Sequence, residues 1–496
     1  MKTKKILFLC ALTVSTMLSA TTITVTNNAS SGDGSFLAAT VSAVDGDAIN
    51  FNFDGTEISL TDVIAMKSIT INGLNAFNNK KMILKQATVT KNYFTLATGI
   101  TVNLQNLVFD GLSTAASIAI TAVNGSTLNI QNCVFKNINS SLNNGAVARI
   151  QGVANINNTL FDKNICAGSY GGGALCIYNA ADVTIDKCSF TGNISNINGA
   201  NKTGGGAIVA RGTVTTGPCN VKITNSTFAN NKSQMAGGAI LAGVISSSDC
   251  VVNVTAVNCS FTGNQGDGAV SAFTTVKGKA NVYLVNSIVV NNVNAAADSY
   301  SDILETKGTD AATVAMVEPH NIIYSVAPTI VTTDRNCVQV ADPSTANIFN
   351  ALETFATDKK RPVLSTSNGQ TVAMISSTSI VKAAGVAALS PYTIPTVDQL
   401  SETRPATPAI GAVEFKDLGT GFSNLKNEDK IQLILKEREI SFSGLSENSE
   451  VRIYGLTGNL LLKSVVRNNQ TISLQNIREN LVLLKIGSQS FKLLLK

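Results

Sequence analysis

The chain has 496 residues, which is enough for a large core and two or more domains, and only 14% of them are charged. Globular proteins average roughly a quarter charged residues, so this composition favours stacked strands of small polar and β-branched residues over surface helices. Of the formal net charge of +5, three lysines near the start contribute +3 and residues 420–496 contribute +4, which leaves −2 for residues 21–419. Residues 21–419 are therefore almost neutral, which argues against a nucleic-acid-binding surface.

The first twenty residues have the pattern of a secretory signal. A basic start at Lys2–Lys5 precedes the apolar run Ile6–Val14, and Leu18-Ser19-Ala20 fits a cleavage site. A membrane anchor is the competing interpretation, but the apolar run is too short to span a bilayer. We therefore expect residues 1–20 to be a signal peptide. No later segment approaches eighteen apolar residues, so we expect no membrane-spanning segment in the mature chain.

A short amphipathic helix is predicted ahead of the main pattern. Ser35 is a good N-cap for a helix over Phe36–Val44, and Gly46 is expected to end it. The side chains predicted on its apolar side are Phe36, Leu37 and Val41. Strand alternation is found on either side of the helix, at Thr21–Thr26 and Ala48–Phe53. Such a helix is typical of a cap that covers the first coil of a solenoid.

From about residue 58 to residue 324 the sequence reads as short strands, and one unit recurs seven times at spacings of 26–38 residues. Its polar column is Asn106, Asn132, Asn158, Lys187, Asn225, Asn258 and Asn286. Three residues later lies an apolar column of Phe109, Phe135, Phe161, Phe190, Phe228, Phe261 and Val289. Propeller blades need about 40–50 residues each, and the regular leucines of leucine-rich repeats are missing.

This period predicts an all-β fold, a right-handed parallel β-helix (solenoid). Identical positions then stack along the axis at about 4.8 Å. We expect the Asn column to lie at a bend, with amides bonded to one another, and the Phe column to form an interior stack.

A glycine-rich element follows the repeat unit in five coils, within residues 143–147, 171–175, 204–208, 237–240 and 267–270. A phosphate-binding loop needs a helix start or a Lys-Ser/Thr pair after its glycines. Each copy here continues into apolar strand residues instead. We therefore expect the glycines to provide bends with positive φ, and the Ala that follows them to fit a crowded interior.

These motifs carry a family resemblance. The pairing of GGA[ILV] with FxxN, as in Phe190–Asn193, resembles the repeats of chlamydial polymorphic outer-membrane proteins. Residues 26–51 are similar to the cap of exported bacterial β-helix proteins of the pectate-lyase-like superfamily. Asp398–Phe415 resembles the closing motif of Bacteroidetes surface proteins with a choice-of-anchor β-helix domain, although Leu400-Ser401 replaces the usual Arg-Gly. The resemblance covers residues 21–415 and implies a cell-surface β-helix.

The last part of the chain has a different composition. Residues 416–430 read as a linker, and residues 431–496 contain five or six antiparallel strand candidates with turns at Gly458-Asn459 and Gly487-Ser488. We predict a small antiparallel β-sandwich here. Val451–Gly458 and the Lys-rich end are similar to the C-terminal sorting domain of type IX secretion substrates, which implies binding to that secretion machinery. Glu479-Asn480-Leu481 stands where that family has Gly-x-Tyr.

Polysaccharide cleavage is the main enzymatic alternative, because β-helices host lyases and hydrolases that use clustered carboxylates. Asp110, Asp162 and Asp186 fall in different columns of the repeat. Asp182 and Asp186 share one coil with Lys187, and a solvated pair beside a bend explains them better than a site. The insertions Ile194–Thr203 and Thr213–Cys219 would be the walls of an enzyme's groove.

No catalytic, cofactor-binding or metal-binding residue is assigned, and no cofactor is expected. His320 is the only histidine, which excludes a His-based zinc site by count. It stands beside Pro319, as surface or turn residues often do, and no G-x-S-x-G elbow accompanies it.

Eight cysteines remain after Cys10 leaves with the signal peptide. Cys133, Cys188 and Cys259 occupy one column of small residues two coils apart, which is too far for a disulfide. Cys219 and Cys250 come from adjacent coils two residues out of register, so their pairing stays open. The state of Cys166 and Cys176 is open as well.

The expected organisation is a signal peptide (1–20), a parallel β-helix with an N-terminal cap (21–415), a linker (416–430) and a sorting-like β-sandwich (431–496). The expected role is that of a secreted or cell-surface protein, associated with the outer membrane through its C-terminal domain. We expect an adhesin-like or structural function with a polysaccharide or a host or cell-surface component as partner. The alternative is a polysaccharide lyase or hydrolase.

Overall fold

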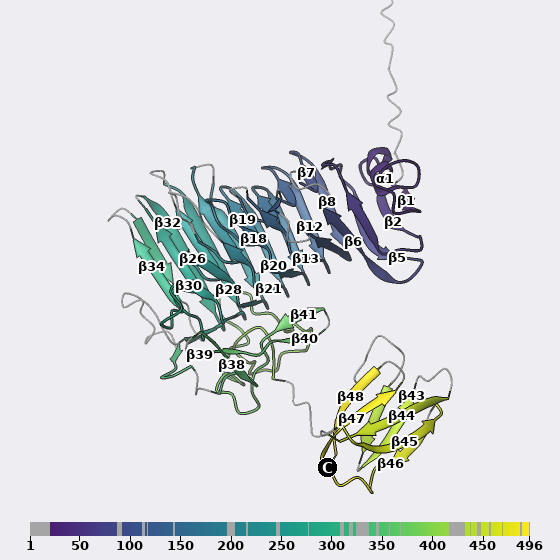
Figure 1. Cartoon of the computed structure of the whole chain (residues 1–496). Coiled ribbons are helices and arrows are strands. Elements are labelled where there is room, and N and C mark those ends of the chain that lie inside the picture. Colours follow the sequence, from purple (N-terminus) through teal and green to yellow (C-terminus); the bar gives the residue numbers. More distant parts are fainter. Residues whose placement is uncertain are drawn as a thin grey trace, which may run out of the picture. The chain divides into compact units, whose positions relative to one another are not determined.

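The chain forms two compact units, Met1–Phe415 and Lys416–Lys496 (Figure 1). A computed structural model describes residues 20–86, 92–111, 115–116, 118–141, 144–195, 204–214, 217–244, 249–275, 277–307, 312–316, 321–323, 337–343, 347–356, 358–367, 369–415, 432–436, 438–443, 448–455, 458–468, 470–486 and 489–495. The predicted signal peptide (except Ala20), the predicted linker and His320 lie outside these ranges. Within them, no helix is long and apolar enough to cross a membrane.

The first unit is a parallel β-solenoid of about nine turns, and only 2% of the structure is helical. Sheet A consists of β1 (Thr22–Val25), β2 (Ala48–Phe51), β5 (Thr70–Asn75), β8 (Thr101–Gln105), β12 (Thr127–Gln131), β16 (Val153–Asn157), β20 (Asp182–Asp186), β24 (Cys219–Thr224), β28 (Val251–Val257), β32 (Gly278–Val285) and β35 (Ala312–Met316). Sheet B consists of β3 (Glu57–Leu60), β6 (Lys80–Gln86), β9 (Leu107–Asp110), β13 (Val134–Lys136), β17 (Leu160–Asp162), β21 (Ser189–Thr191), β25 (Thr227–Ala229), β29 (Ser260–Thr262), β33 (Ile288–Val290), β36 (Ile322–Ile323) and β37 (Val338–Gln339).

Two further sheets contribute strands to the coils. Sheet C contains β4 (Ile64–Ala65), β7 (Phe94–Leu96), β11 (Ile120–Ala122), β15 (Ala148–Ile150), β19 (Leu175–Tyr178), β23 (Ile208–Gly212), β27 (Ile240–Val244), β31 (Val270–Thr274) and β34 (Ile303–Lys307). Sheet D is short and contains β10 (Ala115–Ala116), β14 (Asn139–Ser140), β18 (Ile165–Cys166), β22 (Ile194–Ser195), β26 (Lys232–Ala236) and β30 (Gln265–Asp267). The predicted parallel β-helix is confirmed.

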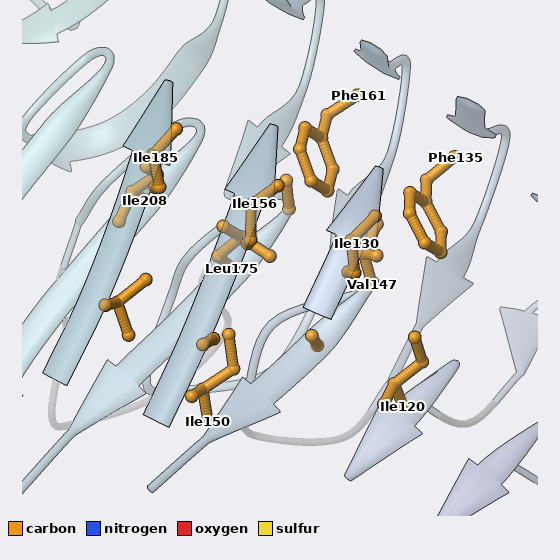
Figure 2. Close-up of a cluster of buried hydrophobic side chains, with 14 of the residues drawn as sticks. Ile120, Ile130, Phe135, Val147, Ile150, Ile156, Phe161, Leu175, Ile185 and Ile208 are labelled. Atoms are coloured by element: carbon orange, nitrogen blue, oxygen red, sulfur yellow. The ribbon is translucent and has the colours of Figure 1, made fainter. Parts of the chain in front are cut away.

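The interior is built from identical positions that stack in register. Phe135 pairs with Phe109 on one side and Phe161 on the other. The rings from Phe109 to Phe261 stack with centroids 4.5 to 5.4 Å apart, and all six are buried. Figure 2 shows Phe135 and Phe161 on successive coils beside the aliphatic row Ile130, Ile156 and Ile185. The predicted interior Phe stack is confirmed, and offset aromatic stacking adds to the burial of apolar area.

The Asn column occupies the corner between sheets A and B. All seven of its members, Lys187 included, have φ between +46° and +57°. Asn tolerates this left-handed conformation better than other non-glycine residues, which explains the residue choice. The predicted amide bonds are present where Asn132 donates to Asn106 (2.7 Å), but Lys187 interrupts the row.

A second, fully buried row of amides lies at the next corner. It is formed by the Asn that ends each FxxN motif. Asn164, Asn193, Asn231, Asn264 and Asn292 each donate to the side-chain oxygen of the next member, at 2.8–2.9 Å, and the last donates to Asp302. Each also donates to the backbone oxygen of a residue in the Phe column, as Asn231 does to Phe190 (2.9 Å). This row satisfies backbone groups that the corner removes from strand pairing.

The glycine-rich elements bend into sheet C as predicted. Gly171, Gly172, Gly205 and Gly237 have φ between +70° and +84°. A Cβ at Gly173 or Gly206 would lie 2.0 Å from a backbone oxygen of the next coil, so a larger residue has no room. The Ala that follows each element is buried, which confirms the crowded interior.

The cap helix α1 spans Phe36–Ser42, and the Ser35 hydroxyl accepts from Ala38 N (3.2 Å), as predicted for its N-cap. Two details of the prediction were wrong. The helix ends at Ser42 and not at Gly46, because Ala43 already has an extended ψ of 148°. Val41 is 69% exposed; the buried helix residues are Phe36, Ala39 and Thr40, and Phe36 stacks on Phe51 (5.7 Å). Phe36 and Val41 are five residues apart, which places them about 140° apart around the helix, so they cannot share one face.

Residues 347–415, which we call the cover, do not continue the coils. They form two hairpins, β38 (Leu352–Ala356) with β39 (Lys359–Pro362) and β40 (Ser365–Ser367) with β41 (Gln370–Val372), followed by an irregular segment. The hairpin β40/β41 lies beside the coil strands of sheet B, and β41 contacts β21 and β25 (Figure 1).

The second unit contains two antiparallel sheets that share one apolar core, which confirms the predicted small C-terminal fold. One sheet is β42 (Gln432–Lys436), β43 (Glu439–Ser443) and β46 (Thr471–Ser473). The other is β45 (Leu460–Val466), β44 (Ser449–Tyr454), β47 (Leu481–Ile486) and β48 (Gln489–Leu494). Gly458 has the positive φ (85°) expected of a turn, whereas Gly487-Ser488 lies outside the described residues. Asn480 accepts from Arg438 (3.0 Å) and precedes β47.

The buried amide row predicts that two Asn→Ala substitutions differ in how much they lower the free energy of unfolding. Asn231→Ala removes four side-chain hydrogen bonds and leaves groups of Asn193 and Phe190 buried without partners. We expect a loss of about 3 kcal/mol in the free energy of unfolding. Asn253→Ala breaks a similar row on the outer face of sheet A and should cost less than about 1 kcal/mol. Urea unfolding followed by circular dichroism measures both, and equal losses would contradict this account of the interior.

Candidate functional site

The cover docks on the outward side of the Asn column. Five successive members of the column bond to it. Gln370 donates to Asn158 (3.0 Å), Lys187 to Ser401 (3.2 Å) and Arg404 to Asn225 (2.9 Å), while Asn258 donates to Ala409 O (3.3 Å) and Asn286 to Val386 O (2.8 Å). The corner that closes each coil is therefore also the surface that holds the cover.

Four side chains of the segment 398–414 fix this docking. Asp398 accepts from the backbone N–H groups of Leu400, Glu402 and Glu414, each at 2.8 Å. Gln399 is buried and donates to Cys188 O (3.0 Å). Arg404 forms an ion pair with Glu414, and the exposed fractions of these side chains are 2% and 11%. Burial lowers the pKa of the Arg404 guanidinium, and the adjacent Glu414 carboxylate counteracts that shift.

This docking places the turn 389–393 beside the outer face of sheet A and creates a groove of about 640 Å³. Its floor is Asn253 and Thr255 of β28 with Tyr283 of β32, and its wall is the turn, including Tyr392. The turn is closed by Tyr392 N, which donates to Leu389 O (2.7 Å). A contiguous part of the groove extends to Asn220 and Lys222 of β24.

The groove combines two aromatic rings with oriented amides. The rings of Tyr283 and Tyr392 are half-buried, with centroids 6.4 Å apart at an angle of 45°. Asn281 donates to Asn253 and Asn253 to Asn220, both at 2.9 Å, and this chain of bonds fixes the orientation of each amide. Lys222 adds one exposed positive charge. Ligand sites typically combine aromatic faces with a few placed polar groups, as this groove does.

The carboxylates singled out in the sequence do not meet in this groove. Asp110 binds Asn137 (3.1 Å) and Lys136, and Asp162 accepts from Thr191 (2.7 Å). Asp186 accepts from Asn157, Thr224 and Asn225 across three coils. Asp182 is exposed, and Lys187 turns to Ser401 of the cover. These are structural bonds between coils.

None of the eight described cysteines forms a disulfide. Cys219 aligns with Val252 and donates to Ile177 O, so the possible pair with Cys250 is not formed. Burial raises the pKa of Cys133, Cys176 and Cys259 to about 12, which keeps these thiols protonated. The column of Cys133, Cys188 and Cys259 holds small residues, as predicted. Among the residues that the structure describes, no group of three or more His, Cys, Asp or Glu side chains could hold a metal ion.

The groove residues were not identified from the sequence. Tyr283 alternates outward in a strand, which is visible in the sequence, but nothing marks it as a ligand contact. Tyr392 lies in a segment without periodicity, and its approach to Tyr283 depends on the docking of the cover. The insertion 194–203 lies outside the described residues beyond Ser195, and Cys219 of the other insertion begins β24. No protein-family model matches the chain, and no curated protein matches it.

The buried ion pair predicts that the cover can be loosened by one substitution. Arg404→Met leaves the Glu414 carboxylate and the Asn225 oxygen without their partner, which should cost about 3–5 kcal/mol. We expect limited proteolysis within residues 347–415 to become faster while the coils stay folded. Arg361→Met removes the exposed pair with Glu353 and should change stability by less than about 1 kcal/mol. If the two variants are cleaved at the same rate, Arg404 does not hold the cover.

Proposed function

We propose that this protein is an exported, surface-displayed β-helix that binds a polysaccharide in the groove between Tyr283 and Tyr392. The observation that carries the proposal is the pairing of two half-buried rings with a row of oriented amides on a rigid sheet. A sugar ring has an apolar face, which suits stacking on tyrosine, and a rim of hydroxyl groups, which suits amides. The strand positions below the groove are fixed by the coil register, so the site is preorganised.

The geometry supports binding better than cleavage. Carboxylate-based glycoside hydrolysis needs two such groups on either side of the scissile bond. The residues that line the groove are Asn220, Val221, Lys222, Asn253, Thr255, Val257, Tyr283 and residues 389–393, none of which is Asp or Glu. An adhesin-like or structural role therefore fits this groove. A lyase or hydrolase is the alternative, which an assay for cleavage products would detect.

The location of the protein is part of the same proposal. The pattern of residues 1–20 indicates export, and the resemblance of residues 431–496 to type IX sorting domains suggests retention at the cell surface of a Bacteroidetes-type bacterium. The resemblance of the coils to pectate-lyase-like and polymorphic outer-membrane proteins supports an extracellular partner. The C-terminal unit has its own core, which fits a module that serves anchoring separately from binding.

Binding in the groove should depend on its rings. Tyr283→Ala is expected to raise the Kd for a polysaccharide that the protein binds by about tenfold, because a stacked ring is lost. Asn129→Ala, on the same face but outside the groove, should leave the Kd unchanged. Calorimetry across neutral and acidic polysaccharides measures both variants. New reducing or unsaturated ends would support the enzymatic alternative, and equal Kd values for both variants would place the site elsewhere.

The two-unit organisation predicts a separable anchor. Deletion of residues 431–496 should leave the coils folded with an unchanged unfolding midpoint, while the protein moves from the cell to the medium. Ile453→Asp, which puts a charge in the core of the second unit, should reproduce this release. Cell fractionation and circular dichroism give the result. Unfolding of the truncated protein would show that residues 431–496 stabilise the coils instead.

A further inference from the structure

The outer face of sheet C carries an apolar patch that is buried. Outward positions of parallel strands usually contact solvent unless another element covers them. Here Cys176, Tyr178, Val209 and Leu241 form a cluster of their own, separate from the solenoid core, with Phe273 packed against it. Strand register places Cys176 beside Val209 and Tyr178 beside Arg211. An arginine is therefore part of an apolar surface.

Arg211 is only 6% exposed. Arg211 and Arg149 each pack against an aromatic ring. Its guanidinium carbon lies 3.9 Å from the ring centroid of Tyr170. The guanidinium carbon of Arg149, which is half-buried, lies 4.8 Å from the ring centroid of Tyr178. Stacking occupies the flat face of a guanidinium and leaves its N–H groups, which lie in the plane, available for acceptors.

Four buried donor atoms of this cluster have no acceptor among the residues that the structure describes. Nε and Nη1 of Arg211, Nε of Arg149 and the hydroxyl of Tyr178 are buried without a hydrogen-bond partner. The other deeply buried arginine among the described residues is Arg404, which pairs with Glu414, whereas no described carboxylate forms an ion pair with Arg211. A buried cation without a counter-charge is unfavourable, and a cluster of orphaned donors around it points to an anionic ligand.

We infer that Arg211, Arg149 and Tyr178 form a binding site for an oxyanion, either a carboxylate or a sulfate group. Guanidinium and phenol groups both donate to such an anion, and the apolar residues around them exclude the water that would compete. Arg211 is the buried, inner contact of the site and Arg149, which is half-buried, is the outer contact. The same chemistry is present in free oxyanions and in the acidic groups of polysaccharides. This site is on sheet C and does not depend on binding in the groove on sheet A.

The test is a titration of the full-length protein with sodium acetate, sodium sulfate and a glucuronate-containing oligosaccharide, against sodium chloride at matched ionic strength. We expect at least one of the three to raise the Tm of the coil unit saturably, because a ligand that binds only the folded state stabilises it. Arg211→Met should abolish that rise. Arg211→Lys keeps the charge but loses the planar guanidinium with its paired N–H donors, and it should weaken the affinity at least tenfold. Arg361→Met, which removes a half-buried arginine of the cover, is the control and should behave as the wild type.

The outcomes distinguish a free oxyanion from an acidic sugar, and they decide whether the proposal holds. A rise with acetate or sulfate shows recognition of the free oxyanion, and a rise with the oligosaccharide alone shows an acidic sugar. In chloride, Arg211→Met should be at least as stable as the wild type, because the substitution removes an uncompensated buried charge. If it does not fold, Arg149→Met provides the same comparison from the outer contact. The proposal is overturned if none of the three anions exceeds chloride, or if the Arg211 and Arg149 variants respond as the wild type does.

Discussion

The sharp corners of each coil are the constraint on which the rest of this structure depends. Strands of successive coils pair without interruption, but at a corner the chain leaves the ladder and its backbone groups must find other partners. At each of these two corners one residue has a positive φ, which turns the chain, and a buried Asn follows the second corner. The Asn amide bonds to the backbone of one neighbouring coil and to the amide of the other. The row ends at Asp302, a carboxylate that accepts without needing a further acceptor.

The first corner links the fold to the candidate site. The side chains of its column face outward, and five successive members, four Asn and Lys187, bond to the cover. The spacing of the coils therefore sets the path of residues 370–409. The turn 389–393 reaches sheet A because Val386 and Ala409, on either side of it, are held by Asn286 and Asn258. The groove is thus a consequence of the corner geometry, although no groove residue belongs to the corner itself.

Periodicity explains which parts could be predicted from the sequence. A repeated position reports the same environment many times, and so the Phe stack, the bend at Asn and the small column at Cys133 followed from their spacing. The cover occurs once and has no period. Its contacts join residues such as Gln399 and Ser189, which are 210 positions apart, through side chains whose types fit many loops. The end and the buried face of the cap helix were predicted wrongly for a similar reason. A helix of seven residues has too few turns for the apolar pattern to determine its buried face.

The same logic indicates where function can be added to such a fold. Inward positions and corners are fixed by stacking, whereas an outward strand position can change without altering the register. On sheet A one outward column runs Asn103, Asn129, Asn155, Thr184, Lys222, Thr255 and ends in Tyr283, which is the one aromatic residue of that column. On sheet C the outward Arg211 stands beside Tyr178 where its next neighbour is Gly243. Tyr283 faces away from the solenoid core. Arg211 stacks on Tyr170, but its charge is buried without an ion-pair partner among the described residues, which is unfavourable for folding. Residues that stability does not explain are the ones for which binding is the better physical account.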